Sequence, residues 1–139
     1  VKGVRYMYHD PCHSPMKTYR PLKVVSQLTG QDVPANERCC GESGTLAATR
    51  ADISTQVRFR KEEEMVRGAG KLRADGFAGE VKVLTSCPSC LQGLSRFDRD
   101  SGTQADYIVV EMARHLLGEN WMPEFVHKAR HGGIERVLL

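Results

Sequence analysis

The sequence has no apolar run that approaches the roughly 18 residues of a membrane-spanning helix, and no signal peptide opens it. It also has no dominant charge, because 20 Lys and Arg are interleaved with 17 Asp and Glu for a net charge of +3. The bases Arg58, Arg60 and Lys61 are followed at once by three glutamates, which is typical of a solvated helix face. We therefore expect no membrane span and no nucleic-acid partner.

Motifs for nucleotide binding and hydrolysis are missing as well. No GxGxxG or P-loop pattern surrounds Gly41 and Gly44, and the sequence offers no paired catalytic carboxylates and no Ser-His-Asp set. Glu42 is the one acid that lies beside a candidate site, the cysteine pair at 39 and 40. We therefore do not expect the chain to turn over a substrate alone.

The length and composition are those of one globular domain. The chain has 139 residues, of which 40% are hydrophobic and 27% charged. A chain of this size can build its core without disulfides. Its first residue is Val1 rather than Met, so we expect residues 1–139 to form a single domain excised from a longer polypeptide.

Hydrophobic periodicity predicts strands that alternate with helices. Largely apolar or β-branched runs predict strands at residues 4–8, 81–85 and 107–110, and the last apolar run, 137–139, is either a further short strand or a cut end. Helical spacing predicts helices over 15–28 and 49–76, after Cys90, and over 111–117. This order predicts an α/β fold with a mainly parallel sheet that is covered by helices.

Cysteines follow two of these strands directly, at Cys12 and Cys87. The loops at the carboxyl ends of parallel strands converge on one edge of the sheet, where the chemistry of such folds collects. If the two strands are neighbours, their cysteines meet there.

The chain has five cysteines in the pattern C, CC, CxxC. They are Cys12, Cys39, Cys40, Cys87 and Cys90. Disulfides fit poorly, because the number is odd and cytoplasmic thiols stay reduced. A role as small buried hydrophobes does not explain why all five lie near Pro and Gly in loops. A thioredoxin-type CxxC pair leaves the other three cysteines unexplained.

Several thiolates together select zinc, copper(I) or an iron–sulfur cluster. Adjacent cysteines such as Cys39 and Cys40 point in different directions, which suits a centre with several metal atoms. The CxxC at Cys87 and Cys90 precedes a helix, whose N-terminus favours negative sulfur.

Three segments together resemble the cysteine-rich CCG domain family. They are residues 9–13 (HDPCH), residues 39–41 (CCG) followed by Ser43 and Gly44, and residues 85–91 (TSCPSCL). The family includes a cysteine-rich subunit of heterodisulfide reductase and the iron–sulfur subunits of glycolate, lactate and anaerobic glycerol-3-phosphate dehydrogenases.

The resemblance implies an α/β domain that holds a 4Fe-4S cluster, with all five cysteines as candidate ligands. It implies an iron–sulfur electron-transfer domain of a larger oxidoreductase in the cytoplasm, where any membrane association comes from partners. Expected partners are a flavin-dependent dehydrogenase domain or subunit, which would carry FAD, and other iron–sulfur modules. The gap before Cys87 is longer than is usual in the family and is expected to hold extra helix.

Two alternatives remain open. His9 and His13 flank Cys12 and would either ligate metal, donate hydrogen bonds to a cluster, or simply build the loop. The alternative to an iron–sulfur domain is a structural zinc-binding or interaction module, in which three or four cysteines close a tetrahedral site without a redox role.

Overall fold

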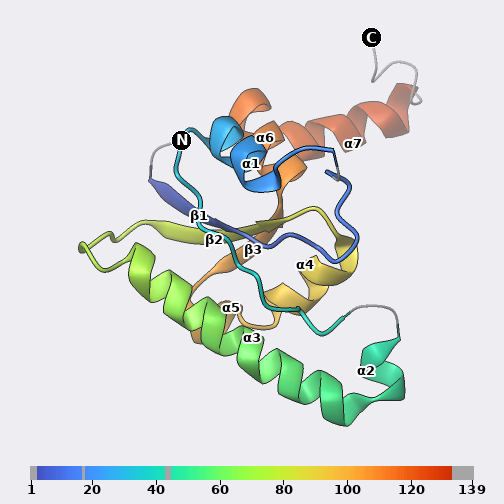
Figure 1. Ribbon diagram of the computed structural model, residues 1–139. Helices are drawn as coiled ribbons and strands as arrows, with labels where there is room; N and C mark the ends of the chain where they lie inside the picture. Colours follow the sequence, from blue (N-terminus) through green and yellow to red (C-terminus); the bar gives the residue numbers. More distant parts are fainter. Residues whose placement is uncertain (1–2, 17, 43–44, 133–139) are drawn as a thin grey trace. The chain divides into compact units, whose positions relative to one another are not determined.

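The computed structural model describes residues 3–16, 18–42 and 45–132, and the first part of the chain is built around a three-stranded parallel sheet (Figure 1). The strands are β1 (Val4–Tyr8), β2 (Glu80–Thr85) and β3 (Gln104–Tyr107), in the order β1-β2-β3. Helix α1 (Pro21–Thr29) lies on one face of the sheet and α3 (Ala51–Leu72) on the other. The predicted α/β fold with a parallel sheet is confirmed.

The two faces of the sheet bury separate cores. Tyr6 and Tyr8 of β1 pack with Leu84 of β2 and Val25 of α1. The alternate residues pack in a second cluster with α3 and with α4 (Pro88–Ser95). That cluster contains Met7, Val81, Val83, Met65, Ala69, Leu94 and Phe97, together with Cys40 and Cys90. Because successive residues of a strand face opposite ways, β1 and β2 serve both cores.

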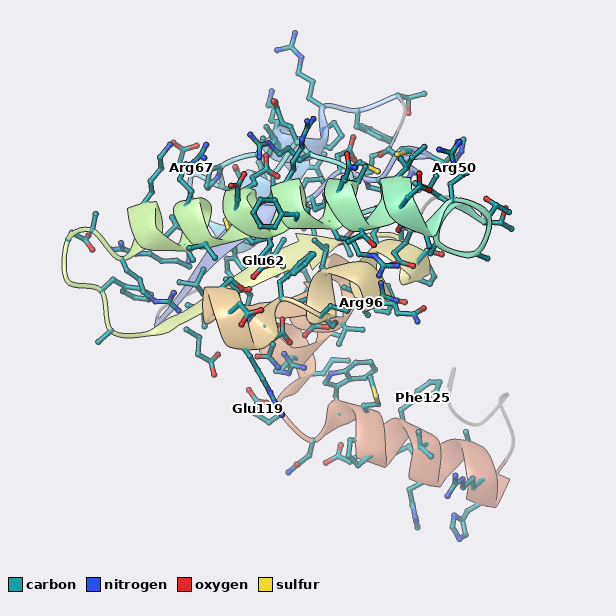
Figure 2. All side chains as sticks on the ribbon, turned by 90° about the horizontal axis from the view of Figure 1, so that it is seen from below. Arg50, Glu62, Arg67, Arg96, Glu119 and Phe125 are labelled. Carbon is teal, nitrogen blue, oxygen red and sulfur yellow. The ribbon has the colours of Figure 1, made fainter. Side chains whose placement is uncertain are left out.

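Helix α3 comes unusually close to β1. A Cβ atom at Gly68 would lie 2.5 Å from the Sδ atom of Met7, so only glycine fits there without a shift. Figure 2 labels Arg50, which directly precedes α3, and Glu62 and Arg67, which lie along the helix. The helix is shorter than the predicted 49–76, because the chain forms a separate turn, α2 (Leu46–Thr49), before it.

Two predicted boundaries differ from the structure. The first helix begins at Pro21 rather than at 15, because the residue before a proline is held extended and Arg20 has φ −86° and ψ 104°. The third strand is β3, at 104–107 rather than 107–110, because it pairs with Lys82–Thr85 and β2 ends there. Ile108 then begins a helix, α6 (Ile108–Leu117).

The remaining helices are α5 (Asp98–Ser101), α6 and α7 (Trp121–Gly132). The chain forms two compact units, and the boundary between them follows Ile108. In the second unit, Glu111 accepts hydrogen bonds from Arg114 and His115. No helix in the described part of the chain is long and apolar enough to cross a membrane. The predicted strand at 137–139 lies outside the described residues.

Candidate metal centre

The cysteine-bearing segments leave the sheet at one edge. The segments that carry Cys12 and Cys87 follow β1 and β2, which are parallel neighbours. The segment that carries Cys39 and Cys40 also passes this edge. Just before these cysteines it runs beside the end of β1, where the backbone amide of Asn36 donates to the carbonyl of Tyr8 at 2.8 Å. The predicted placement of cysteines at the carboxyl ends of the strands follows from this topology.

Cys40 and Cys90 lie at the centre of the site. Their Sγ atoms are 3.3 Å apart, although 50 positions separate them in sequence, and both side chains are buried. Two thiol sulfurs at this distance can form a hydrogen bond. The hydrogen bond from Cys90 lowers the pKa of Cys40, and the same contact raises the pKa of Cys90. The contact thus favours deprotonation of Cys40 and keeps the proton on Cys90.

Backbone amides support negative charge on these sulfurs. The amide of Gly41 donates to Cys39 Sγ at 3.3 Å, and the amide of Glu42 helps to lower the pKa of Cys40. Gly41 has φ +81°, a left-handed conformation that favours glycine and turns the chain around the sulfurs. Cys87 caps the N-terminus of α4, where the helix dipole also favours negative charge.

The other three cysteines lie next to this pair. Partial burial raises the pKa of Cys12, with further contributions from the neighbouring Cys39 and Cys40. Cys87 contacts Cys90 and contributes to the raised pKa of that thiol. Cys12 is exposed and Cys39 is half-buried, and Cys39 borders a surface hollow of about 380 Å³. The site thus runs from a buried pair to the protein surface.

His9 joins the buried pair, whereas His13 does not. One ring nitrogen of His9 and the sulfurs of Cys40 and Cys90 all lie within 4.8 Å of one another, and all three side chains are buried. A hydrogen bond with His9 also lowers the pKa of Cys40. His13 is exposed, and no contact described for it reaches the sulfurs.

Glu42 has a structural role beside the pair. Its carboxylate forms ion pairs with Arg58 of α3, at 3.3 Å, and with Arg96, just after α4. It therefore ties the loop that carries Cys40 to two helices. Ser43 and Gly44, the rest of the family motif, lie outside the described residues.

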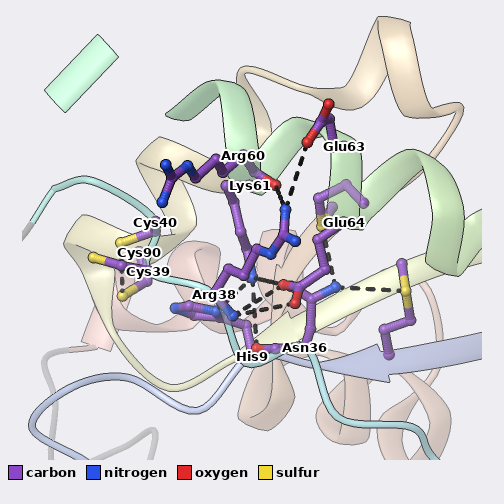
Figure 3. A network of polar contacts seen from close by, with 12 residues as sticks. His9, Asn36, Arg38, Cys39, Cys40, Arg60, Lys61, Glu63, Glu64 and Cys90 are labelled. Atoms are coloured by element: carbon purple, nitrogen blue, oxygen red, sulfur yellow. Dashed lines mark hydrogen bonds and ion pairs between the residues drawn. The ribbon is translucent and has the colours of Figure 1, made fainter. Parts of the chain in front are cut away.

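Lys61 is a residue of the site whose burial the charge pattern of the sequence does not predict. The charge pattern predicts a solvated helix face, but the side chain of Lys61 is fully buried. Figure 3 shows it in a network with His9, Asn36 and Glu64, next to the cysteines. A signal is present in the sequence, because Lys61, Met65 and Ala69 follow at four-residue steps on one face of the helix.

The donor set fits a soft or borderline metal. Two sulfurs that are already close together, with a lowered pKa at Cys40 and no carboxylate in the His9, Cys40 and Cys90 group, match the preference of zinc and iron–sulfur clusters for thiolate. Five cysteines exceed the four ligands of one tetrahedral zinc ion. The donor set therefore fits a metal centre rich in thiolate ligands.

Comparisons with known proteins agree with the predicted resemblance. The family model of the cysteine-rich domain, CCG, matches residues 6–95, and that of a domain of unknown function, DUF3400, matches residues 95–139. The chain is 30% identical over 94 residues to a subunit of the fumarate reductase (CoM/CoB) of Methanothermobacter marburgensis, across 63% of this chain and 17% of that relative.

A second relative is an uncharacterized iron–sulfur protein of Methanocaldococcus jannaschii. It is 28% identical over 123 residues, which cover 81% of this chain and 23% of the relative. The chain thus spans about a fifth of the length of these curated relatives. No solved structure matches it.

Proposed function

We propose, from the premise that this chain belongs to the cysteine-rich CCG family, that it is an iron–sulfur electron-transfer domain of a larger oxidoreductase. The observation that carries the proposal is the contact between Cys40 and Cys90, which joins two distant motifs at 3.3 Å. The names of the two relatives, a reductase subunit and an iron–sulfur protein, support the same role.

The proposed ligands of a 4Fe-4S cluster are the five cysteines. They are Cys12, Cys39, Cys40, Cys87 and Cys90. When bound, such a cluster accepts and releases single electrons. The protein holds the thiolates with the amides of Gly41 and Glu42 and with the N-terminus of α4. Cys39 opens to the surface hollow, so electrons would enter or leave on that side.

We further propose that residues 1–139 are one module of a longer cytoplasmic protein. The share of each relative that the chain spans, 17% and 23%, supports this organisation. The proposed partners are a flavin-dependent dehydrogenase domain or subunit, which would hold FAD, and other iron–sulfur modules. The domain itself would receive and pass on electrons without turning over a substrate.

A structural zinc site is the second candidate. The observation that favours it is the compact set of three ligand atoms, from His9, Cys40 and Cys90, within 4.8 Å of one another. Three protein ligands at this spacing can surround a single metal ion. Zinc would give a colourless protein without redox activity, whereas an iron–sulfur cluster absorbs visible light.

Anaerobic reconstitution with iron and sulfide tests the proposal. We expect visible absorption and a reversible one-electron paramagnetic resonance signal in the wild type, and loss of both in Cys40→Ser, because oxygen is a harder ligand than thiolate. Ser89→Ala, an exposed position in the same CxxC motif but without a sulfur, is the matched control and keeps both signals. A colourless wild type that binds stoichiometric zinc equally well with and without Cys40 would contradict the proposal.

A further inference from the structure

Lys61 is a buried cation that hydrophobic packing alone does not explain. Its side chain is 0% exposed on the inner face of α3. Burying an ammonium group is costly unless each of its donors finds a partner. Here Nζ lies 2.8 Å from Glu64 Oε1 and 3.0 Å from His9 Nδ1, and it also donates to the side-chain oxygen of Asn36. All three partners lie on the side of α3 that faces the cysteine loops (Figure 3).

The contact with Lys61 bears on which ring nitrogen of His9 accepts a hydrogen bond. Burial lowers the pKa of Lys61, but the hydrogen bond and charge of Glu64 oppose this effect and favour the ammonium form. An ammonium group has donors only, so in that form Nδ1 of His9 is the acceptor in this contact. In the neutral imidazole the proton then lies on Nε2. Since His9 also hydrogen bonds Cys40, its Nε2–H is the group that is free to donate to sulfur.

This arrangement makes His9 a hydrogen-bond donor to the site rather than a metal ligand. A nitrogen that carries a proton offers no lone pair to a metal. Among the groups within 4.8 Å, the sulfurs of Cys40 and Cys90 therefore remain as ligands. The three-ligand set that favours a single zinc ion is reduced to two.

We propose that Lys61 is a positioning residue for the metal centre: it fixes the Nε2–H tautomer of His9, aims that donor at Cys40, and places a buried positive charge behind the Cys40–Cys90 pair. The electrostatic part of this inference rests on the proposed iron–sulfur function. Hydrogen bonds to cluster sulfurs and nearby positive charge both stabilise the more negative, reduced state. Lys61 thus raises the reduction potential of a bound cluster.

Glu64 limits this effect and provides a test with the opposite sign. Its carboxylate holds Lys61 and also accepts the backbone amide of Arg38 at 3.1 Å. It carries a negative charge that partly cancels the field of the ammonium group. Removing that charge should favour the reduced cluster, whereas removing the lysine should disfavour it.

The first experiment measures midpoint potentials of the reconstituted protein. We expect Lys61→Met to shift the one-electron equilibrium about tenfold toward the oxidised cluster, a decrease of about 59 mV, and Glu64→Gln to shift it in the opposite direction. Lys71→Met removes the same charge from an exposed position of α3 and should leave the potential unchanged. Equal potentials in the wild type, Lys61→Met and Glu64→Gln would overturn the proposal.

The second experiment does not need a cluster. Long-range ¹H–¹⁵N spectra of the metal-free wild type report which ring nitrogen of His9 carries the proton. We expect the Nε2–H tautomer in the wild type and in Lys71→Met, and a mixture of tautomers in Lys61→Met. An Nδ1–H tautomer in the wild type would overturn the role of Lys61 even if a cluster binds. A failure of the wild type to bind iron would instead overturn the proposed function.

Discussion

Gly93 marks the point where α4 meets the loop that carries Cys40. A Cβ atom there would lie 2.6 Å from Glu42 Cγ and 3.3 Å from the carbonyl oxygen of Cys40. Glu42 cannot simply turn aside, because Arg58 and Arg96 hold its carboxylate. The absence of a side chain at one residue therefore brings Cys40 close enough to α4 to reach Cys90.

We expect Gly93→Ala to destabilise the protein and to weaken metal binding. The added methyl group forces the Glu42 loop outward, and overpacking of this kind costs about 1–3 kcal/mol of unfolding free energy. Urea denaturation of the metal-free protein measures the cost. Gly70→Ala is the control, because nothing lies within 4 Å of a Cβ there, and alanine in the last turn of α3 should leave the stability equal or slightly higher. Equal stability of the two variants would disprove this account of Gly93.

Among the elements, α5 contains a carboxylate that destabilises the fold when ionised. Burial raises the pKa of Asp98, and its Oδ1 atom has no hydrogen-bond partner among the described residues. The folded state thus holds this proton more tightly than the unfolded state. The stabilising contribution is complete below the unfolded-state pKa of about 4 and is lost as the pH rises through the folded-state pKa.

We therefore expect Asp98→Asn to be more stable than the wild type at pH 7. The neutral amide avoids the cost of the buried charge, and the advantage should disappear at about pH 3, where aspartate is itself neutral. Thermal denaturation across this pH range measures the difference. Asp32→Asn, at an exposed position, controls for the loss of one charge. If the stability advantage of Asp98→Asn over the wild type grew as the pH fell, the prediction would be wrong.

The elements also show what the sequence could predict. Apolar runs located β1 and β2 closely, because both strands are buried on two faces and their sequences are correspondingly apolar. The β-forming residues 108–110 were misassigned, since the end of β2 limits β3, and a local pattern contains no information about its partner strand. Element order predicted that the segments after β1 and β2 would meet at one edge.

The burial of Lys61 on α3 cannot be predicted from the local sequence pattern. Charged neighbours such as Arg60 and Glu63 made the segment look solvated, and they are indeed exposed. Lys61 differs from them only in its position around the helix. Its partners, His9 and Asn36, come from distant segments that only the fold brings together. Spacing alone could place Lys61 on the inner face but could not supply the reason for a cation there.

At the scale of the whole molecule, the two hydrophobic clusters are built mainly from residues other than cysteine. One cluster, with Tyr6, Tyr8 and Leu84, lies on the face of the sheet that α1 covers and contains no cysteine. The other includes Cys40 and Cys90 but is built mainly from apolar residues such as Met65, Val83 and Leu94. Cys12 and Cys39 lie in irregular segments outside both clusters.

We therefore expect the fold to survive removal of the metal. A chain of this length buries enough apolar surface in two clusters to remain folded, in contrast to small zinc domains, in which metal binding supplies the folding free energy. Circular dichroism after chelation should retain the helical signal and a cooperative thermal transition. The segments around Cys12 and Cys39 should gain hydrogen exchange, because they lose the ligand that holds them.

Met65→Ala provides the comparison for this prediction. Met65 is 0% exposed and contributes no ligand, and truncating such a side chain costs about 2–5 kcal/mol. If the core carries the stability, this substitution should lower the unfolding free energy more than chelation does. The reverse order, or a gradual transition after chelation, would show that the metal centre is part of the core. The cysteine segments would then be structural elements of the fold rather than loops attached to a stable sheet.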